Sequence, residues 1–157
     1  MNSSKMNGGE RMTVIEFFES GNAVYQSILE PVCNEYDVTY MEMMILLFLA
    51  NNPKMDKARD IVEKRHIAKS HASTSIRSLM EKGYIEGKNL NGDKRSIHLS
   101  ILPKAKKIVL AGQKAQKEYF KVLTKGFSKE ELDILKSCMQ KMKENLDGKE
   151  KEIKNGK

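Results

Sequence analysis

The chain has 157 residues, of which 39% are hydrophobic and 31% are charged, and it carries a formal net charge of +7. This length suits one domain with a sizeable core. The longest apolar run covers residues 43–50, far short of the roughly 20 residues that a membrane-spanning helix needs. These numbers exclude a protein embedded in a membrane.

Two features predict a cytoplasmic protein. The chain holds only two cysteines, Cys33 and Cys138, and residues 1–11 are polar, with no apolar signal segment. Small secreted domains are instead rich in paired cysteines. We expect residues 1–11 to form a disordered leader.

Apolar spacing predicts the first two helices. In residues 14–36 apolar side chains recur at helical spacing, and Pro31 lies inside the pattern, where a kink or an early stop is expected. Thr39 and Glu42 are spaced as a capping box for a second helix. That helix is apolar nearly all round over residues 43–49, so it must be buried on most sides.

A helix, a short turn and another helix follow. The third helix is expected over residues 57–64, with Asp56 as the nearest capping residue. The fourth covers residues 69–82, and Gly83 is expected to end it in a left-handed conformation. Its buried stripe consists of Ala72, Ile76, Leu79 and Met80.

Two strands come next. Residues 84–88 predict one strand, and the alternation of apolar and polar residues over 97–101 predicts a second, half-buried one. Between them, Asn91-Gly92 is a strong signal for a hairpin turn. The order of these elements predicts a winged helix-turn-helix in residues 38–102.

The chain ends in two predicted helices. Pro103 suits the first turn of a long helix that reaches about Gly126. Ser128 and Glu131 form a second capping box, which starts a last helix. Residues 148–157 are highly charged, and we expect a frayed tail there.

The fold class is therefore mainly α, with a small β-hairpin wing. The outer helical regions, 12–37 and 103–147, have more apolar face than a small core can use. We expect these regions to pair with a second copy of the chain.

Positive charge is concentrated on the predicted winged helix. Residues 54–107 carry 14 basic and 6 acidic residues, whereas the rest of the chain carries 14 basic and 15 acidic residues. A compact basic module is typical of proteins that bind a phosphate polyanion. Double-stranded DNA is the expected partner.

The helix over residues 69–82 offers a face for contacting DNA. Opposite its buried stripe lie small hydrogen-bonding side chains, which suit a major groove. Arg77 can hold a phosphate or donate two hydrogen bonds to guanine. A solvated helix face is the alternative, and the basic module argues against it. The candidates are Lys69, Ser70, His71, Ser73, Thr74 and Arg77.

The predicted hairpin turn supplies three further candidates, Asp93, Lys94 and Arg95. A two-stranded ribbon with cations near its tip can enter a minor groove, and a guanidinium suits that narrow, negative groove. Arg95 is the candidate for insertion, and Asp93 could hold its guanidinium in place. An ordinary charged hairpin tip is the alternative.

These elements carry a family resemblance. Five segments resemble the MarR family of bacterial transcription regulators: Ala58–Val62, Lys69–Ser70, Ile76–Leu79, Glu81–Ile85 and Asp93–Arg95. The similarity covers residues 14–146. It implies a homodimer with interlocking terminal helices, a palindromic operator, and regulation by a small molecule or an oxidant. It also implies that Arg95 enters the minor groove.

The chain departs from the family pattern at three predicted helix starts. Lys57, Ala68 and Leu102 stand where family members commonly have Ser or Thr. A missing hydroxyl cap typically costs about 0.5–2 kcal/mol. Either Asp56 and Ser70 compensate, or these helix starts fray.

Sensor chemistry has few candidates. Cys33 is the redox candidate, but Glu30 and Glu35 flank it, whereas a reactive thiol needs cationic neighbours, so Cys33 and Cys138 are expected to be inert. The histidines are not spaced as ligand pairs, so neither a metal nor another cofactor is expected. Candidates for an effector pocket are Tyr25, Tyr36, Met41 and Met44, with ordinary core positions as the alternative for each.

The sequence thus predicts a homodimeric, sequence-specific DNA-binding transcription regulator, a repressor released by a small-molecule effector. The alternatives are a non-specific architectural DNA-binding protein, a thiol-based redox regulator, and a winged helix that binds an acidic protein. No carboxylate pair, nucleophile–base set or cofactor loop indicates an enzyme.

Overall fold

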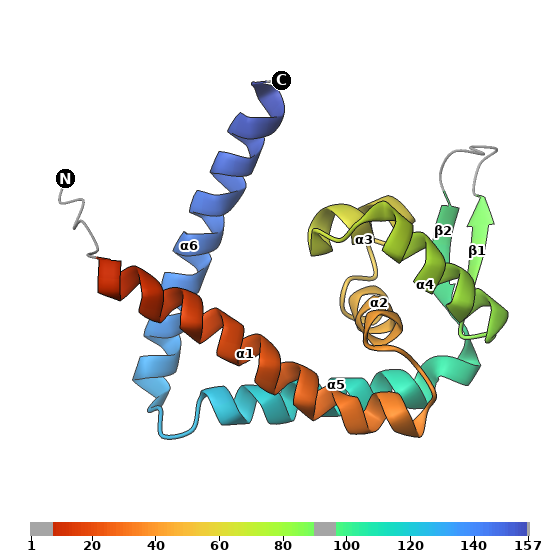
Figure 1. Cartoon of the computed structure of the whole chain (residues 1–157), viewed down its shortest axis with the longest axis horizontal. Helices are drawn as coiled ribbons and strands as arrows, with labels where there is room; N and C mark the ends of the chain where they lie inside the picture. The colour runs from red at the N-terminus through yellow and green to blue at the C-terminus, as the bar shows by residue number, and fades with distance from the viewer. Residues whose placement is uncertain (1–7, 90–96, 157) are drawn as a thin grey trace. The chain divides into compact units, whose positions relative to one another are not determined.

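The computed structural model describes residues 8–89 and 97–156, and the chain divides into two compact units, Met1–Tyr119 and Phe120–Lys157. Its mainly helical order with one hairpin confirms the predicted fold class (Figure 1). The elements are α1 (Gly8–Glu35), α2 (Tyr40–Asn51), α3 (Ala58–Arg65), α4 (Lys69–Glu81), β1 (Ile85–Asn89), β2 (Ile97–Ile101), the short 3-10 helix η1 (Pro103–Ala105), α5 (Lys106–Leu123) and α6 (Lys129–Asn155).

The first helix, α1, is longer than the sequence predicted. It begins at Gly8, so the expected disordered leader is wrong for residues 8–11, and residues 1–7 lie outside the described part of the chain. Once a helix is nucleated, each added residue gains a hydrogen bond, which offsets the poor helix propensity of glycine. The early stop expected at Pro31 is absent, since α1 continues to Glu35. Proline removes a single backbone donor, and the rest of the helix keeps its hydrogen bonds.

Helix α2 forms the centre of the first unit. Figure 1 shows it nearly end-on, with α3 and α4 on one side and α1 and α5 on the other. Met43 and residues 45–49 are all buried, as the apolar sequence predicted. Gly112 of α5 approaches α2 so closely that a Cβ added there would lie 2.8 Å from the sulfur of Met43. The all-round apolar surface of α2 is therefore explained by neighbours on every side.

A buried carboxylate connects the start of α2 to the end of α4. Glu42 is 1% exposed. Its Oε2 accepts a hydrogen bond from the Thr39 backbone N–H at 2.7 Å and another from Lys82 Nζ at 3.0 Å. Lys82 Nζ also donates to the backbone carbonyl of Asp37 at 2.7 Å. The capping box predicted from Thr39 and Glu42 is confirmed, and its glutamate also fixes the C-terminal end of α4.

The predicted winged-helix elements form with small shifts. Helix α4 buries Ala72, Ile76 and Leu79, as expected, whereas Met80 is half-buried. Gly83 adopts a φ of 69° directly after the helix, which confirms the left-handed stop.

Strands β1 and β2 pair antiparallel, with Ile85 opposite Ile101 and Gly87 opposite Leu99. The first strand begins and ends one residue later than predicted. Only Leu99 is fully buried on β2, because Ile97 is 46% exposed. Asn91-Gly92, the predicted turn, lies outside the described residues.

Neutral polar side chains join three helices of the first unit. The side-chain amide of Asn51, at the end of α2, donates to Gln116 Oε1 and accepts from Gln113 Nε2, both at 3.0 Å. Gln116 Nε2 donates in turn to the hydroxyl of Tyr25 in α1 at 3.0 Å. The winged helix is thus hydrogen-bonded to both outer helices of this unit.

The second unit holds the end of α5 and the whole of α6. The Ser128–Glu131 capping box is confirmed, with both of its hydrogen bonds present. Gly126 has a φ of 87° and lies in the turn between the helices. The expected frayed tail is wrong in its extent, since α6 continues to Asn155. A contact of 2.9 Å between Lys149 and Glu152 supports this last stretch of helix.

Over residues 8–89 and 97–156, every helix is too short or too polar to cross a membrane.

The pKa of Glu42 reflects two opposing effects. Burial, the largest single effect, raises it. Hydrogen bonds from the Ser78 side chain, the Thr39 backbone and Lys82 together outweigh burial, so the pKa of Glu42 lies below its usual value. The carboxylate is therefore held in its charged form by groups from α2 and α4.

Replacing this carboxylate should destabilise the first unit in a pH-dependent way. We expect Glu42→Gln to lower the free energy of unfolding near neutral pH by about 1–3 kcal/mol, measured by urea unfolding. Because the folded-state pKa is lowered, this stabilisation is present above the unfolded-state pKa and is lost as the pH falls through the folded-state pKa. The difference between Glu42→Gln and wild type should therefore shrink in acid.

The matched control is Glu81→Gln, which alters an exposed glutamate at the end of α4. It should change the free energy of unfolding by less than about 0.5 kcal/mol. A difference between Glu42→Gln and wild type that stays constant down to about pH 3 would contradict the assignment.

Candidate nucleic-acid interface

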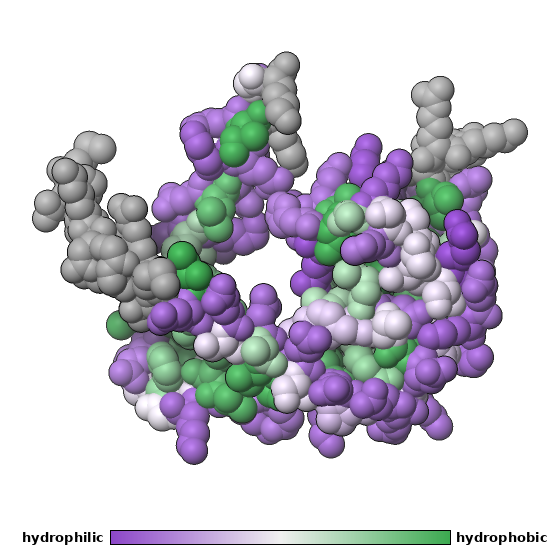
Figure 2. Space-filling view, in the orientation of Figure 1, coloured by the Kyte–Doolittle hydropathy of each residue, from purple (hydrophilic) through white to green (hydrophobic). Residues whose placement is uncertain are grey.

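The outward face of α4 gathers the candidates that the sequence placed on it. All six side chains are exposed, while the buried stripe on the opposite side faces the core. The structure thus brings together Lys69, Ser70, His71, Ser73, Thr74 and Arg77 on one helix. In Figure 2, hydrophilic and neutral residues predominate over this part of the molecule. A helix surface of this kind offers donors and acceptors without bulky apolar groups.

One of these side chains has a restricted hydrogen-bonding capacity. The Thr74 hydroxyl donates to the backbone carbonyl of Ser70 at 3.0 Å. Its oxygen is then left as an acceptor. In a major groove, an acceptor matches the amino group of adenine or cytosine.

A groove runs along α4 toward β2 and adds residues that the sequence reasoning missed. It has a volume of about 520 Å³ and is bounded by α3, α4 and Ile97. Lys57 and Arg59 at the start of α3 line it together with Lys69 and Ser73 of α4. The sequence shows the basic residues of α3, but it does not show that α3 lies beside α4. Cations from two helices therefore flank the same groove.

The wing candidates Asp93, Lys94 and Arg95 lie outside the described residues. The strands on either side are described up to the Asn89–Ile97 pair. Lys88, near the end of β1, is exposed and contacts Glu86 at 2.6 Å. The hairpin therefore carries a cation on its described part as well.

The three residues that depart from the family pattern do occupy helix N-caps. Lys57, Ala68 and Leu102 precede α3, α4 and η1, and none makes a side-chain cap. The expectation that Asp56 caps α3 is wrong, because its carboxylate lies 2.9 Å from His98 Nδ1. Asp60 compensates instead, since it accepts a hydrogen bond from the Lys57 backbone N–H at 3.1 Å.

Two long-range contacts hold the interface in place and were not predicted. Glu42 and Lys82 fix the end of α4, and Asp56 and His98 attach β2 to the loop before α3. Each pair joins residues about 40 positions apart, so local spacing carries no signal for either contact.

The effector-pocket candidates separate into two groups. Met41 and Met44 line a cavity of about 160 Å³ with Tyr40, Ile45, Ile61, Arg65 and Ile67. Tyr25 instead accepts a hydrogen bond from Gln116, and its ring packs at an angle of 56° against that of Tyr119, with the centroids 5.0 Å apart. Tyr36 is half-buried against the core. The structure therefore brings the two methionines together and leaves the two tyrosines apart from them.

Arg65 gives this cavity a cationic wall. Its guanidinium lies 5.7 Å from the centre of the Phe48 ring. Its Nε is buried and has no hydrogen-bond partner among the residues that the structure describes. A buried donor without a partner costs free energy, which an acceptor on a ligand would recover.

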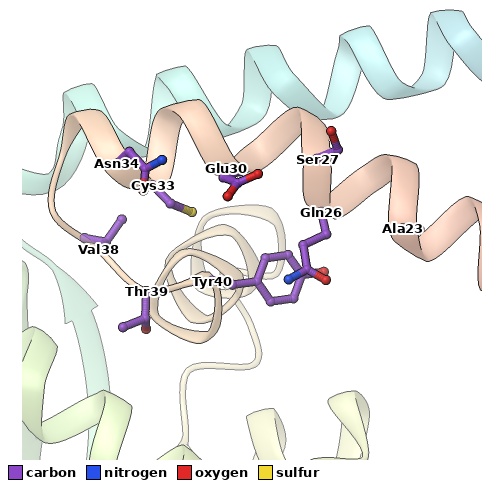
Figure 3. A pocket seen from close by; sticks show the side chains of 9 residues that line it. All are labelled: Ala23, Gln26, Ser27, Glu30, Cys33, Asn34, Val38, Thr39 and Tyr40. Atoms are coloured by element: carbon purple, nitrogen blue, oxygen red, sulfur yellow. The ribbon is translucent and has the colours of Figure 1, made fainter.

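Cys33 lies in a separate pocket of about 460 Å³ between α1 and α2 (Figure 3). The side chain is only 7% exposed. Burial raises the pKa of its thiol, and the nearby carboxylates of Glu30 and Glu42 raise it further. These conditions disfavour the reactive thiolate. Cys138 is exposed on α6.

The three histidines do not form a metal site. His66 follows α3, His71 lies on α4 and His98 lies on β2. Within the described ranges, no three His, Cys, Asp or Glu side chains lie close enough together to hold a metal ion.

A model of the MarR family matches residues 36–96, the segment that contains α2, α3, α4 and β1. This segment is therefore similar to the MarR family. Members of the family are winged-helix transcription regulators and not enzymes, which agrees with the lack of catalytic motifs in the sequence. The comparison with curated proteins found no match for this chain.

Solved structures of MarR proteins share the fold. A MarR family transcriptional regulator from Listeria monocytogenes, complexed with 26-mer DNA, has a TM-score of 0.74 at 20% identity, covering 85% of this chain and 87% of that chain. MarR from Staphylococcus aureus, in complex with salicylate and kanamycin, has a TM-score of 0.65 at 25% identity, covering 86% and 93%. The MepR–DNA complex from S. aureus has a TM-score of 0.63 at 19% identity, covering 92% and 99%.

The burial of Cys33 makes a direct prediction about thiol reactivity. In a Cys138→Ser variant of this chain, Cys33 is the one remaining thiol. We expect it to react with a disulfide reagent at least about tenfold more slowly in the folded protein than in denaturant, because its thiolate is disfavoured and shielded. Absorbance of the released thiol measures the rate. Equal rates in the two conditions would contradict the burial of this side chain.

Proposed function

We propose that this chain is a homodimeric transcription regulator that binds a palindromic DNA operator in a sequence-specific way. The observation that carries the proposal is the exposed polar face of α4. This helix lies within residues 54–107, which hold 14 basic and 6 acidic residues and so have a net charge of +8. In this proposal α4 enters the major groove, where Ser70, Thr74 and Arg77 contact bases. Lys69 and Lys94 contact phosphates, and Arg95 enters the minor groove, with Asp93 beside it.

Exposed apolar side chains outside the winged helix support dimer formation. Phe17 and Phe18 of α1 are 60% and 56% exposed, and α6 exposes several large apolar side chains, including Ile134, Met139 and Leu146. Hydrophobic patches appear on both helices in Figure 2. Apolar surface of this extent is costly in water and is typical of protein–protein contacts. Residues 12–37 and 103–147 are therefore proposed as the dimerisation region.

We further propose that the protein is a cytoplasmic repressor and that a small apolar acid releases it from DNA. The cavity at Met41, Met44 and Arg65 combines apolar walls with a buried donor, Arg65 Nε, that has no hydrogen-bond partner in residues 8–89 and 97–156. The S. aureus MarR structure contains salicylate, a small aromatic acid of this class. Salicylate is therefore a suitable first probe for this chain.

Selection of binding sites from random DNA duplexes tests the main proposal. We expect a two-fold symmetric motif whose half-sites lie about one helical turn apart, because two α4 helices would enter successive major grooves. At a fixed salt concentration, the selected site should bind at least about 10³-fold more tightly than random duplex. Equal affinity for all duplexes would indicate an architectural protein, and a monomer that binds no duplex would contradict the proposal.

Arg77 provides the sharpest single test of the α4 face. We expect Arg77→Ala to weaken operator binding by about 1–3 kcal/mol, measured by fluorescence anisotropy. If Arg77 contacts a guanine, discrimination at one base pair should also relax. If it contacts a phosphate, the loss should be uniform across sequences, and the salt dependence should decrease by about one unit of slope.

The matched control is Lys151→Ala, which removes one exposed positive charge near the end of α6, outside the proposed dimerisation region. It should leave operator affinity within about twofold of wild type, because the charge lies outside the proposed interface. Unchanged affinity in Arg77→Ala would remove Arg77 from the interface.

Arg65 provides the test of the effector site. We expect salicylate to lower the operator affinity of wild type, and Arg65→Met to abolish this response because the buried donor is lost. The control is Lys64→Met, an exposed cation on the same helix that lines neither the cavity nor the groove beside α4, and it should keep the salicylate response. An undiminished response in Arg65→Met would place the effector site elsewhere.

A further inference from the structure

Four neutral polar side chains join α2 to α5 and α1 through a continuous series of hydrogen bonds. Gln113 Nε2 donates to Asn51 Oδ1, and Asn51 Nδ2 donates to Gln116 Oε1, both at 3.0 Å. Gln116 Nε2 then donates to the hydroxyl of Tyr25 at 3.0 Å. We call Tyr25, Asn51, Gln113 and Gln116 the polar joint. Asn51 and Gln116 each use their donor and their acceptor, so the series of bonds runs in one direction.

A close apolar contact between α2 and α5 lies about one helical turn from the polar joint. A Cβ added to Gly112 of α5 would lie 2.8 Å from the sulfur of Met43 and 3.0 Å from Cδ2 of Leu47. Along the same two helices, Asn51 follows Leu47 by four residues, and Gln116 follows Gly112 by four. Apolar packing is not directional, so it holds the two helices together with little preference for one angle. The hydrogen bonds of the joint are directional and resist rotation of α2 against α5.

The polar joint connects two parts of the chain that have different proposed roles. Asn51 ends α2, which belongs to the winged helix of residues 38–102. The other members of the joint lie on α1 and α5, in the proposed dimerisation region. Figure 1 shows α2 between α4 and these two outer helices. In a homodimer, the angle between each winged helix and its outer helices therefore determines how far apart the two α4 helices lie.

We propose that the polar joint sets the angle between the winged helix and the outer helices, and that it thereby selects the spacing between the two half-sites of the operator. This inference rests on the proposed function. The four side chains are positioning residues and need not touch DNA. One inserted base pair moves a half-site by about 3.4 Å along the duplex and turns it by about 35°. A dimer whose angle is held by directional bonds cannot follow this shift without losing contacts.

Duplexes that differ only in half-site spacing test the joint. The strongest duplex recovered from the random pool is compared with versions that carry one base pair inserted or deleted at its centre, at constant salt. We expect these changes to weaken binding by wild type at least about tenfold, and binding by Asn51→Ala about threefold or less. A duplex with a single half-site should bind both proteins within about twofold, because α4 and the hairpin are unaltered.

The matched control is Asn52→Ala, the neighbouring residue. Asn52 Nδ2 donates to the Phe48 carbonyl at 2.8 Å, within the same segment, and takes no part in the joint. Its replacement removes a hydrogen bond from the same end of α2 and should leave the spacing preference of wild type. A loss of affinity in Asn51→Ala by the same factor at every spacing would indicate a merely structural role and would overturn the proposal.

The conservative variant Asn51→Asp should restore the spacing preference. A carboxylate only accepts hydrogen bonds, so it keeps the bond from Gln113 and loses the bond to Gln116. A rotation of the Gln116 amide group turns its donor toward residue 51 and its acceptor toward the Tyr25 hydroxyl, which can donate. The series of bonds then runs toward the carboxylate from both sides. We expect Asn51→Asp to discriminate between spacings within about twofold of wild type.

Residual dipolar couplings of backbone amides test the joint in the free protein, without DNA. In wild type, α2 and α5 should share one alignment order, whereas in Asn51→Ala the order of α2 should fall at least about one fifth below that of α5. Equal orders for the two helices in both proteins would overturn the proposal. If no duplex is preferred over any other, the proposed function fails, while the couplings still decide whether the joint sets the angle.

Discussion

Glu42 places a negative charge inside the first unit, where an uncompensated carboxylate would cost several kcal/mol. The donors that compensate it come from two distant segments: Thr39 at the start of α2, and Ser78 and Lys82 at the end of α4. Protein donors can replace water around the Glu42 carboxylate only when these two segments pack together. The position of α4 is therefore fixed by an electrostatic requirement in addition to apolar packing, and the outward face of α4 follows from it.

The interface is built outward from this anchor. Ala72, Ile76 and Leu79 hold the inner side of α4 on the core, so its polar side must face outward. The Asp56–His98 contact then ties the hairpin to the loop that leads into α3. In the proposed complex with DNA, positive charge on the same segment would attract the duplex at long range, whereas these fixed spacings would determine which groups can reach a base edge. Affinity and selectivity would thus depend on different residues.

Structural features that depend on only a few neighbouring residues were predicted well from the sequence. The capping boxes at Thr39 and Ser128 and the left-handed Gly83 each need one turn of chain, and all three are present. The predicted start of α1 and the predicted end of α6 were wrong, because extending a formed helix costs little and leaves no strong local signal. Asp56 was assigned to the wrong partner, since its choice between a helix N-terminus and His98 depends on tertiary structure. The wing-tip candidates and the DNA contacts stay predictions.

The amide side chains around Asn51 have a consequence for how the molecule responds to its medium. Asn51, Gln113, Gln116 and Tyr25 link the end of α2 to α5 and α1 without any formal charge. Mobile ions screen charged groups and leave such neutral bonds nearly unaffected. A rise in salt concentration would therefore weaken the proposed contacts with DNA phosphates while this joint kept its shape. The affinity for DNA and the arrangement of these three helices would respond differently to the same change in the medium.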